Sequence, residues 1–254
     1  MPAPGPTLLA FELATEACSV ALLHGGELLA RHEVAPRRHA ELALPWAEAL
    51  LAEAGIGKSR IDALAVGIGP GAFTGVRLAI SLVQGIALGL GRPVLPASTL
   101  AALAEPFLVV GPVLAAIDAR MGELYLGEYA ADAEGLPVAL EAECLVPVGE
   151  AAAALQARWA VRPGRDGASV GPRLRVVGSG AAAAEGAWLA SLADRLSEVV
   201  PEALPTAAAV ARIARRDFLA GRVLAPERLE PRYLRDKVAL TAAEQAAARA
   251  ARAG

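Results

Sequence analysis

The sequence contains few of the residues that build disulfide frameworks and metal centres. Cys18 and Cys144 are its only cysteines, too few for a disulfide framework, which favours a protein of the reducing cytosol. Its three histidines, His24, His32 and His39, follow one another at spacings of eight and seven residues. A helical metal pair needs two imidazoles four residues apart, so that both lie on one face of the helix. We therefore expect no metal ion.

We also expect neither a secretory leader nor a membrane-spanning segment. Its first six residues include no basic residue and would not form a helix. The longest apolar run, at residues 78–90, is interrupted by Gln84 and is too short to span a bilayer. With 254 residues, of which 55% are hydrophobic, the chain can bury one large core or two of ordinary size. These features predict a soluble, cytoplasmic protein.

Positive charge is scarce overall and is concentrated near the end of the sequence. The formal net charge is −3, which argues against a general nucleic-acid coat. From Arg212 onward, basic residues outnumber acidic ones by ten to five. A solvated helical face is the favoured explanation, and a phosphate-contacting patch is the alternative.

The most informative motif is a glycine-rich loop, GPGAFTGVR at residues 69–77, between an expected strand at 61–66 and an expected helix at 78–90. Backbone N–H groups at a helix N-terminus favour an anion, so this arrangement is common at phosphate sites. However, the motif lacks the Lys-Ser/Thr pair of a P-loop, and Thr74 stands where a dinucleotide fingerprint has its third glycine. An equal alternative is that the glycines permit a tight turn and close helix packing, with Thr74 or Gly75 capping the helix. The loop residues singled out are Gly69, Gly71, Thr74 and Gly75.

Apolar segments follow the same order twice along the chain. In the first half we expect strands at 8–12, 18–23 and 27–33, a helix at 39–53 kinked or delayed by Pro45, and a short helix capped by Ser98 or Thr99. The second half should hold strands at 113–117 and 123–129, a hairpin near Pro137, a helix at 149–159, a polar loop at 162–167 and a strand at 173–177.

Two helices complete the predicted second half. An alanine-rich helix should open at the Gly178-Ser179-Gly180 turn, and an amphipathic helix should cover residues 206–220. The repeated order predicts duplicated α/β lobes that face each other across a cleft.

Four segments of the sequence closely resemble the TsaB (YeaZ) family. They are LAFELATEACSVAL at 9–22, GPGAFTGVR at 69–77, IDAR at 117–120 and PRYLR at 231–235. The resemblance follows the chain in order over nearly its whole length. It implies an α/β fold of the actin-like and sugar-kinase-like (ASKHA) type, with two related lobes of mixed sheets flanked by helices. Residues 1–106 would form the N-terminal lobe with the partner-binding helices, and residues 107–254 the C-terminal lobe with a basic tail.

The same resemblance implies a role in making N6-threonylcarbamoyladenosine, on the adenosine 3′ of the anticodon in tRNAs that read codons beginning with A. Proteins of this family are not thought to catalyse; they bind and support the related subunit TsaD, the transferase, and a P-loop ATPase, TsaE, joins them. The expected role is therefore a scaffold without a cofactor, reaching tRNA through the complex. Arg232, Arg235 and Lys237 would contact tRNA phosphates or the ATPase, and residues 241–254 would form a frayed helix.

Glu12 is the residue that leaves catalysis open. Actin-like ATPases usually place an acidic residue at the end of the first strand to hold hydrated magnesium, and TsaB proteins commonly have Asp-Thr where this chain has Glu12-Leu13. An active ATPase or phosphotransferase is therefore the alternative function. The favoured interpretation of Glu12 is a strand-end carboxylate bonded to nearby backbone N–H groups. Asp118 and Arg120 leave a similar choice, and the favoured interpretation of this pair is a salt bridge at a strand end. The residues assigned to a vestigial nucleotide site are Glu12, Thr15, Ser19, Gly178 and Gly180.

Two helices are expected to form the partner interface. Ser81, Gly85 and Gly89 recur at steps of four, a stripe of small residues that allows another helix to approach closely. Trp46 is a large anchor of the kind that dominates interface energetics. Because the two halves are homologous, the same surface would also join two copies in a weak homodimer. The interface residues assigned are His39, Leu42, Trp46, Leu50, Arg77, Ser81, Gln84, Gly85 and Leu88.

Overall fold

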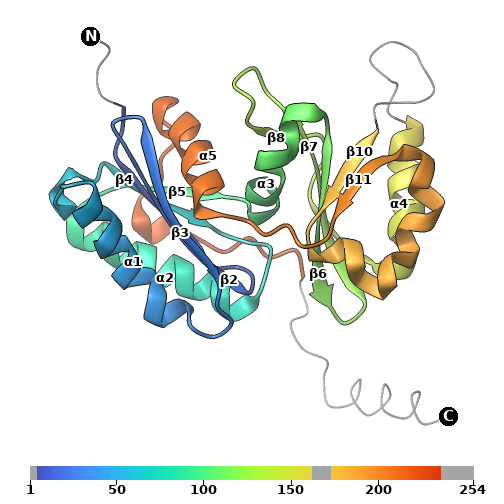
Figure 1. The fold of residues 1–254 in the computed structure, drawn as a ribbon, viewed down its shortest axis with the longest axis horizontal. Helices are drawn as coiled ribbons and strands as arrows, with labels where there is room; N and C mark the ends of the chain where they lie inside the picture. Colours follow the sequence, from blue (N-terminus) through green and yellow to red (C-terminus); the bar gives the residue numbers. More distant parts are fainter. Residues whose placement is uncertain (1–4, 162–172, 236–254) are drawn as a thin grey trace.

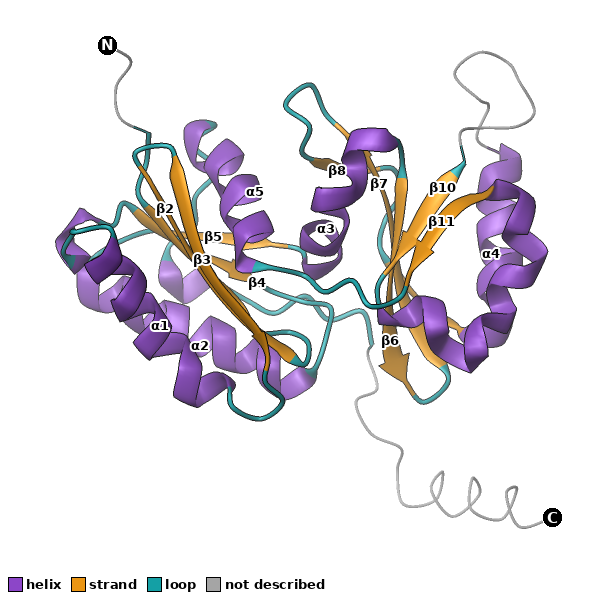
Figure 2. Cartoon of the chain, viewed as in Figure 1, coloured by secondary structure: helices purple, strands orange, loops and turns teal. Residues whose placement is uncertain are grey.

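The computed structural model describes residues 5–161 and 173–235, and these form two β-sheets separated and flanked by helices. From one end of the molecule to the other, the layers are α1 and α2, the first sheet, α5 and α3, the second sheet, and α4 with its neighbouring turns (Figures 1 and 2). Three predicted features lie outside the described residues: the loop at 162–167, the contact of Lys237 and the frayed helix at 241–254.

The first sheet has the strand order β3-β2-β1-β4-β5. Its strands are β1 (Leu8–Glu12), β2 (Ala17–His24), β3 (Glu27–Val34), β4 (Ala63–Gly67) and β5 (Val94–Ala97). The first three form the predicted antiparallel meander, and β4 and β5 continue the sheet in parallel to β1. Helices α1 (His39–Glu53) and α2 (Phe73–Leu90) pack on one face. A 3₁₀ turn, η1 (Lys58–Arg60), precedes β4.

The second sheet repeats this plan with the order β11-β10-β6-β7-β8, and β9 pairs with β7. Its strands are β6 (Val113–Arg120), β7 (Glu123–Ala131), β8 (Pro137–Ala139), β9 (Cys144–Pro147), β10 (Leu174–Val177) and β11 (Leu196–Val200). Strand β6 pairs antiparallel with β7 and parallel with β10, as β1 does with β2 and β4. The two lobes are therefore related, as the sequence predicted.

Helices cover both faces of the second sheet. The short helix α3 (Thr99–Ala104) packs on one face, together with the 3₁₀ turn η2 (Glu105–Val110). Helix α4 (Val148–Val161) and the segment η3 (Ser179–Arg195) cover the other face. The predicted cap of α3 is confirmed at Ser98, whose Oγ accepts the N–H groups of Leu100 at 3.2 Å and Ala101 at 3.3 Å.

Both faces of β1, β2 and β4 are buried, and the two-residue period of a strand decides which core each side chain enters. Along β1, Leu9 and Phe11 join the core under α1 and α2, whereas Leu8 and Ala10 join the core on the opposite face. Helix α5 (Ala207–Leu219) covers that opposite face with its alanines, Val210 and Ile213. Small residues on both sides of this contact allow helix and sheet to pack closely.

The position of α5 departs from the expectation that residues 107–254 form the second lobe. The helix follows the second sheet in sequence but packs on the first, because its apolar stripe completes the core around β1. The predicted bounds of α5 and its amphipathic character are confirmed. Thr206 caps it by accepting the Ala209 N–H at 3.2 Å, and Ser19 Oγ of β2 accepts the Ala207 N–H at 2.9 Å.

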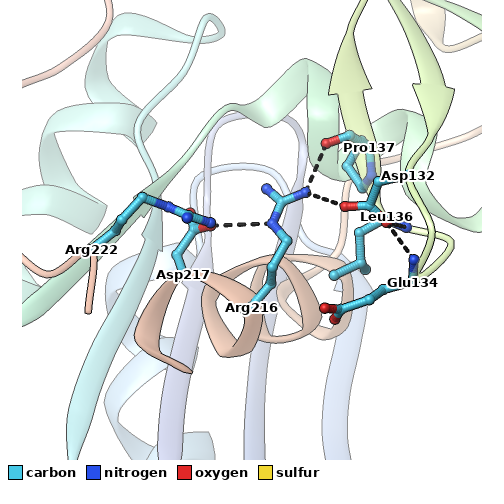
Figure 3. Close-up of polar contacts among 7 residues, drawn as sticks. All are labelled: Asp132, Glu134, Leu136, Pro137, Arg216, Asp217 and Arg222. Carbon is cyan, nitrogen blue, oxygen red and sulfur yellow. Dashed lines mark hydrogen bonds and ion pairs between the residues drawn. The ribbon is translucent and has the colours of Figure 1, made fainter. Parts of the chain in front are cut away.

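Arginines on the far side of α5 contact the second lobe. Arg212 makes two bonds to Glu105, of 2.5 and 2.7 Å. Arg216 donates from Nη1 to Asp132 Oδ2 at 3.0 Å and to the carbonyl of Pro137 at 3.1 Å, both in the β7–β8 hairpin (Figure 3). Burial raises the pKa of Asp132, but hydrogen bonds from the Leu136 N–H and from Arg216 outweigh it, and the pKa is lowered. Helix α5 thus joins the two lobes.

Two other helices differ from the sequence prediction. Helix α2 begins at Phe73, five residues before the predicted start, and its N-cap is Ala72, without a side-chain bond, so neither Thr74 nor Gly75 caps it. The predicted alanine-rich helix is not continuous. Within η3 the backbone leaves helical geometry at residues 183–186, where Ala184 and Glu185 have φ of 49° and 58°. High helix propensity did not preserve the helix there, because tertiary context overrides propensity.

Among the residues that the structure describes, α2 is the one helix long and apolar enough to cross a membrane, judged by length and composition. One face of α2, including Val76, Ala79, Val83 and Ala87, is buried against the first sheet. Core packing accounts for that face and leaves the opposite, exposed face to be explained.

Candidate functional site: the inter-lobe cleft and the exposed face of α2

The glycine-rich loop is packed against the turn between β1 and β2. A Cβ added at Gly71 would lie 2.4 Å from the carbonyl oxygen of Ala14, and one added at Gly75 would lie 2.1 Å from that of Leu13. The Ala72 N–H also donates to the Ala14 carbonyl at 2.7 Å. Close backbone approach therefore explains glycine at positions 71 and 75, which is the structural alternative that the sequence left open.

A cleft of about 960 Å³ lies between the lobes on the side of this loop. The first lobe contributes the β1–β2 turn with Thr15 and Glu16, and the loop from Pro70 to Val76. The second lobe contributes the β6–β7 turn at residues 117–121, together with Tyr125 and Ser179. The chain from Arg232 to Arg235 closes one side. The cleft has the position of a ligand site between two lobes, so its polar lining decides what it can do.

Glu12 does not line this cleft. Its side chain is buried, Oε1 accepts the Ala14 N–H at 2.8 Å, and Oε2 accepts the Thr99 hydroxyl at 3.1 Å. The carboxyl group lies against Gly67, where an added Cβ would be 1.8 Å from Glu12 Oε2 and would force the side chain to move. Burial raises the pKa of Glu12 to about 7, although hydrogen bonds from the Ala14 N–H and Thr99 act in the opposite direction. This is the strand-end carboxylate that the sequence analysis favoured.

The other residues assigned to a nucleotide site do not come together around one ligand position. Thr15 lines the cleft, but Ser19 Oγ is engaged by the Arg31 carbonyl at 3.3 Å and by the N-terminus of α5. Added Cβ atoms at Gly178 and Gly180 would lie 2.5 and 2.8 Å from backbone atoms of Ala116, so both glycines serve close packing. Of the five assigned residues, Thr15 alone lines the cleft.

Asp118 and Arg120 form the expected salt bridge at the β6–β7 turn. Arg120 Nη1 lies 3.1 Å from Asp118 Oδ2, and the Arg120 N–H donates to Asp118 Oδ1 at 2.8 Å. Each therefore serves as the partner of the other at the edge of the cleft.

The histidines make local contacts in the first lobe. His24 Nδ1 lies 2.8 Å from Thr7 Oγ1, and His39 Nε2 lies 3.0 and 3.2 Å from the carbonyl oxygens of Thr15 and Ala17. Within residues 5–161 and 173–235, no three His, Cys, Asp or Glu side chains gather in a group able to hold a metal.

The residues assigned to the partner interface divide into buried and exposed groups. On α1, Leu50 is buried in the core under the first sheet, and His39 is buried beside the cleft, where its ring meets the carbonyls of Thr15 and Ala17, so neither side chain lies on the exposed face of the helix. Leu42 and Trp46 are half-buried against that core. The sequence missed Leu44, which is 47% exposed on the outer face of α1. Leucine recurs throughout this helix, so the pattern did not identify the outward residue.

On α2 the assigned residues Ser81, Gly85 and Leu88 are exposed, as is Gly89. No atom lies within 4 Å of a Cβ added at Gly85 or Gly89. Arg77 and Gln84, also assigned to the interface, make contacts with residues 226–233 of this chain. Arg77 Nε donates to Tyr233 Oη at 2.7 Å, and Gln84 Nε2 donates to the carbonyls of Pro226 and Leu229.

Sequence reasoning also missed an aromatic contact at the mouth of the cleft. The rings of Phe73 and Tyr233 stack with centroids 6.4 Å apart, and the Arg77 guanidinium lies 3.5 Å from the Phe73 centroid. Both segments were quoted as family motifs, at 69–77 and 231–235, but nothing in either one indicated that they meet.

Two related sheets, each built from an antiparallel meander extended by parallel strands and covered by helices, with a cleft between them, define a two-lobed protein of the actin-like fold. The model of one protein family, TsaD, described as tRNA N6-adenosine threonylcarbamoyltransferase, matches residues 31–243. The tRNA threonylcarbamoyladenosine biosynthesis protein TsaB of Escherichia coli K12 is 39% identical over 246 residues, covering 91% of this chain and 96% of that protein. The chain therefore belongs to the TsaB (YeaZ) family.

Two further relatives agree with this assignment. A protein of the same name from Haemophilus influenzae is 47% identical over 125 residues, covering 48% of this chain and 53% of the relative. The solved structure of YeaZ from Pseudomonas aeruginosa superposes with a TM-score of 0.73 at 37% identity, covering 90% of this chain and all of that one.

Proposed function

We propose that this chain is a non-catalytic subunit that docks onto a TsaD-like transferase and supports the formation of N6-threonylcarbamoyladenosine next to the anticodon of tRNAs that read ANN codons. Its relatives in Escherichia coli and Haemophilus influenzae are named as proteins of that biosynthesis. The proposal is supported by the position of the Glu12 carboxylate, which is buried and bonded to the Ala14 N–H and the Thr99 hydroxyl rather than exposed in the cleft. The chain would act in the cytoplasm, without a cofactor of its own.

The observation that carries the proposal is the exposed face of α2. No charged residue occurs from Leu78 to Leu90, yet Ser81, Gly85, Leu88 and Gly89 are exposed. Water is a poor environment for so apolar a face, whereas small residues allow a second helix to approach its backbone. The exposed Leu44 of α1 belongs to a helix that packs on the same face of the sheet. Two such helices on each partner would supply an interface of ordinary size, on the order of 1,600 Å² in total.

The docking surface can be tested by filling the open stripe. Gly85→Trp should leave the fold intact, because no atom lies within 4 Å of the added Cβ. It should abolish binding of a purified TsaD-like subunit in titration calorimetry, because the indole would hold the partner helix away. Ala157→Trp, at an exposed position of α4 in the other lobe, is the matched control and should bind as the wild type does. Undiminished affinity of Gly85→Trp would reject this surface.

Other partners follow from the same assignment. A TsaE-like ATPase would join the heterodimer, and tRNA would be reached through the complex. In isolation the exposed face would pair with a second copy in a weak homodimer, which the TsaD-like subunit displaces. Light scattering that shows only monomer at low micromolar concentration would argue against the homodimer.

A further inference from the structure

The last described segment, residues 224–235, runs from the first lobe to the second, and we call it the C-terminal strap. In Figure 1 it is drawn in red and passes from the first lobe toward the foot of β6. We propose that the strap is a latch that fixes the opening between the lobes and links that opening to helix α2. This inference goes beyond the proposed function and does not depend on it.

The strap is anchored to the first lobe along most of its length. Leu224 and Val94 exchange two backbone hydrogen bonds of 2.9 Å, which adds the strap to the edge of β5. The 3₁₀ turn η4 (Pro226–Arg228) follows, and Gln84 of α2 holds the carbonyls of Pro226 at 3.0 Å and Leu229 at 3.2 Å. The Leu229 side chain is buried in the core under α1 and α2. The strap therefore moves with the first lobe.

Two arginines at the end of the strap reach the second lobe. The Arg232 N–H still bonds the Ile68 carbonyl of the first lobe at 2.8 Å, while Arg232 Nε lies 3.1 Å from Glu143 Oε2. The Glu143 side chain is buried, and its Oε1 accepts the hydroxyl groups of Ser98 and Tyr129. Loss of Arg232 would leave a buried carboxylate without the cation that faces it, which disfavours release of this contact.

Arg235, the last residue of the strap, contacts the second lobe at the β6–β7 turn. Its Nη2 donates to the carbonyls of Ala119 at 3.1 Å and Arg120 at 3.3 Å and pairs with Glu123. Arg120 and Met121 have φ of 62° and 59°, a left-handed conformation that L residues rarely adopt. Arg235 thus binds the second lobe at a strained turn that lines the cleft.

Tyr233 connects these contacts to α2. Its ring stacks on Phe73, and its hydroxyl accepts from Arg77 Nε at 2.7 Å. Phe73, Arg77 and Gln84 lie on one stripe of α2 and all three touch the strap, and the exposed stripe of Ser81 and Gly85 is adjacent. A molecule that packs on the exposed stripe therefore lies beside the residues that position the strap.

The latch is tested by measuring the distance between the lobes in the full chain. Spin labels at Ala49→Cys of α1 and Ala190→Cys of η3 occupy exposed positions, in a Cys144→Ser background, since Cys18 is buried. Arg235→Ala removes the contact of the strap with the β6–β7 turn, and Tyr233→Ala removes its contact with Phe73 and Arg77 of α2. Arg31→Ala is the control, because it breaks an ion pair of 2.5 Å with Glu53 that lies wholly within the first lobe.

We expect the distance distribution from electron paramagnetic resonance to broaden roughly twofold in Arg235→Ala and in Tyr233→Ala, since local contacts set the free energy of such openings. Arg31→Ala should leave it unchanged. Hydrogen exchange at the Arg232 N–H should rise in both strap variants, which would show that the strap has been released. An unchanged distribution in either strap variant, whether or not exchange rises, would overturn the proposal, as would equal broadening in Arg31→Ala.

Discussion

The carboxyl group of Glu12 lies close to the cleft but is buried outside it. Its oxygens occupy the space beside Gly67, and the same Thr99 hydroxyl that donates to Glu12 accepts the Gly69 N–H at 3.1 Å. The residue therefore connects the end of β1, the glycine-rich loop and the start of α3. A group held in this way contributes to stability, and its titration should be visible in unfolding.

The stability of the protein should fall as pH rises through neutrality because of Glu12. Its pKa is about 7 in the folded state against an ordinary value of 4.5, so the folded state holds the proton more tightly between these values. The contribution of Glu12 to the free energy of unfolding is complete below the pKa of the unfolded state. It is lost as pH rises through the pKa of the folded state, a loss of about 3 kcal/mol. Denaturant unfolding at pH 5 and pH 8 should show this loss in the wild type and a smaller one in Glu12→Gln.

Glu48→Gln is the control for that comparison, because Glu48 is exposed and its pKa is lowered by the hydrogen bond from Lys58. It should leave the change between pH 5 and pH 8 as in the wild type. If Glu12→Gln also kept the full wild-type dependence on pH, Glu12 would not be the group responsible.

Two glycines of the same helix should respond in opposite directions to alanine. Gly75→Ala places a Cβ 2.1 Å from the Leu13 carbonyl oxygen and should lower the free energy of unfolding by about 2 kcal/mol. Gly85→Ala meets open space and should raise it by about 1 kcal/mol through helix propensity. Chemical denaturation of the two variants measures both effects. A stable Gly75→Ala protein would contradict the close packing of loop and turn.

At the scale of elements, the return of α5 to the first sheet makes the first lobe discontinuous in sequence. Without α5, the face of β1 that carries Leu8 and Ala10 would lose its cover, together with neighbouring apolar residues of β2, β4 and β5. Exposure of apolar area costs about 25 cal/mol per Å², so a lobe cut before α5 should not be stable.

A fragment of residues 1–97 should therefore lack a cooperative unfolding transition, whereas the same fragment joined by a flexible linker to residues 204–235 should have one. Circular dichroism during thermal unfolding distinguishes the two. Val210→Asp in the joined fragment is the control and should abolish the transition, because it buries a charge in the contact between helix and sheet. Cooperative unfolding of residues 1–97 alone would show that α5 is dispensable.

These elements also show how much of the fold could be predicted from the sequence. Alternation and turn residues predicted the meander of β1 to β3, and the bounds of α1 and α3 agree with the prediction. The periodicity of α5 predicted that one face of the helix is apolar. It did not predict that this face packs on the first sheet, because an amphipathic pattern shows which face is buried but not which element covers it. For the same reason the sequence did not show that the side chains of His39 and Leu50 are buried, and both were assigned to the partner interface. Their direction depends on how α1 is rotated on the sheet, which the sequence alone did not specify.

The break in η3 and the docking of the strap were beyond sequence reasoning for other reasons. Alanine favours a helix, so nothing at residues 183–186 predicted a left-handed turn. The contact of Tyr233 with Phe73 joins residues far apart in the chain, and each motif alone indicates no partner. The placement of Glu12 was anticipated, because a carboxylate at a strand end readily accepts backbone N–H bonds.

At the scale of the whole molecule, the lobes are connected on two sides. Helix α5 contacts the β7–β8 hairpin through Arg216, and the strap contacts Glu143 and the β6–β7 turn on the side of the cleft. The exposed stripe of α2 lies on the outside of the first lobe, beside the strap. The molecule is thus a two-lobed body in which the exposed stripe of α2 and the strap lie side by side on the first lobe.

The central claim is that this chain supports a reaction that it does not perform, and the most direct measurement is nucleoside mass spectrometry of tRNA after a reconstituted reaction. The reaction would contain a TsaD-like subunit, a TsaE-like ATPase and a threonylcarbamoyl donor, with or without this chain. Wild-type chain should raise the yield of N6-threonylcarbamoyladenosine and Gly85→Trp should not, while the chain and donor without the TsaD-like subunit should yield none. Modified nucleoside formed by the purified chain without that subunit would contradict the account.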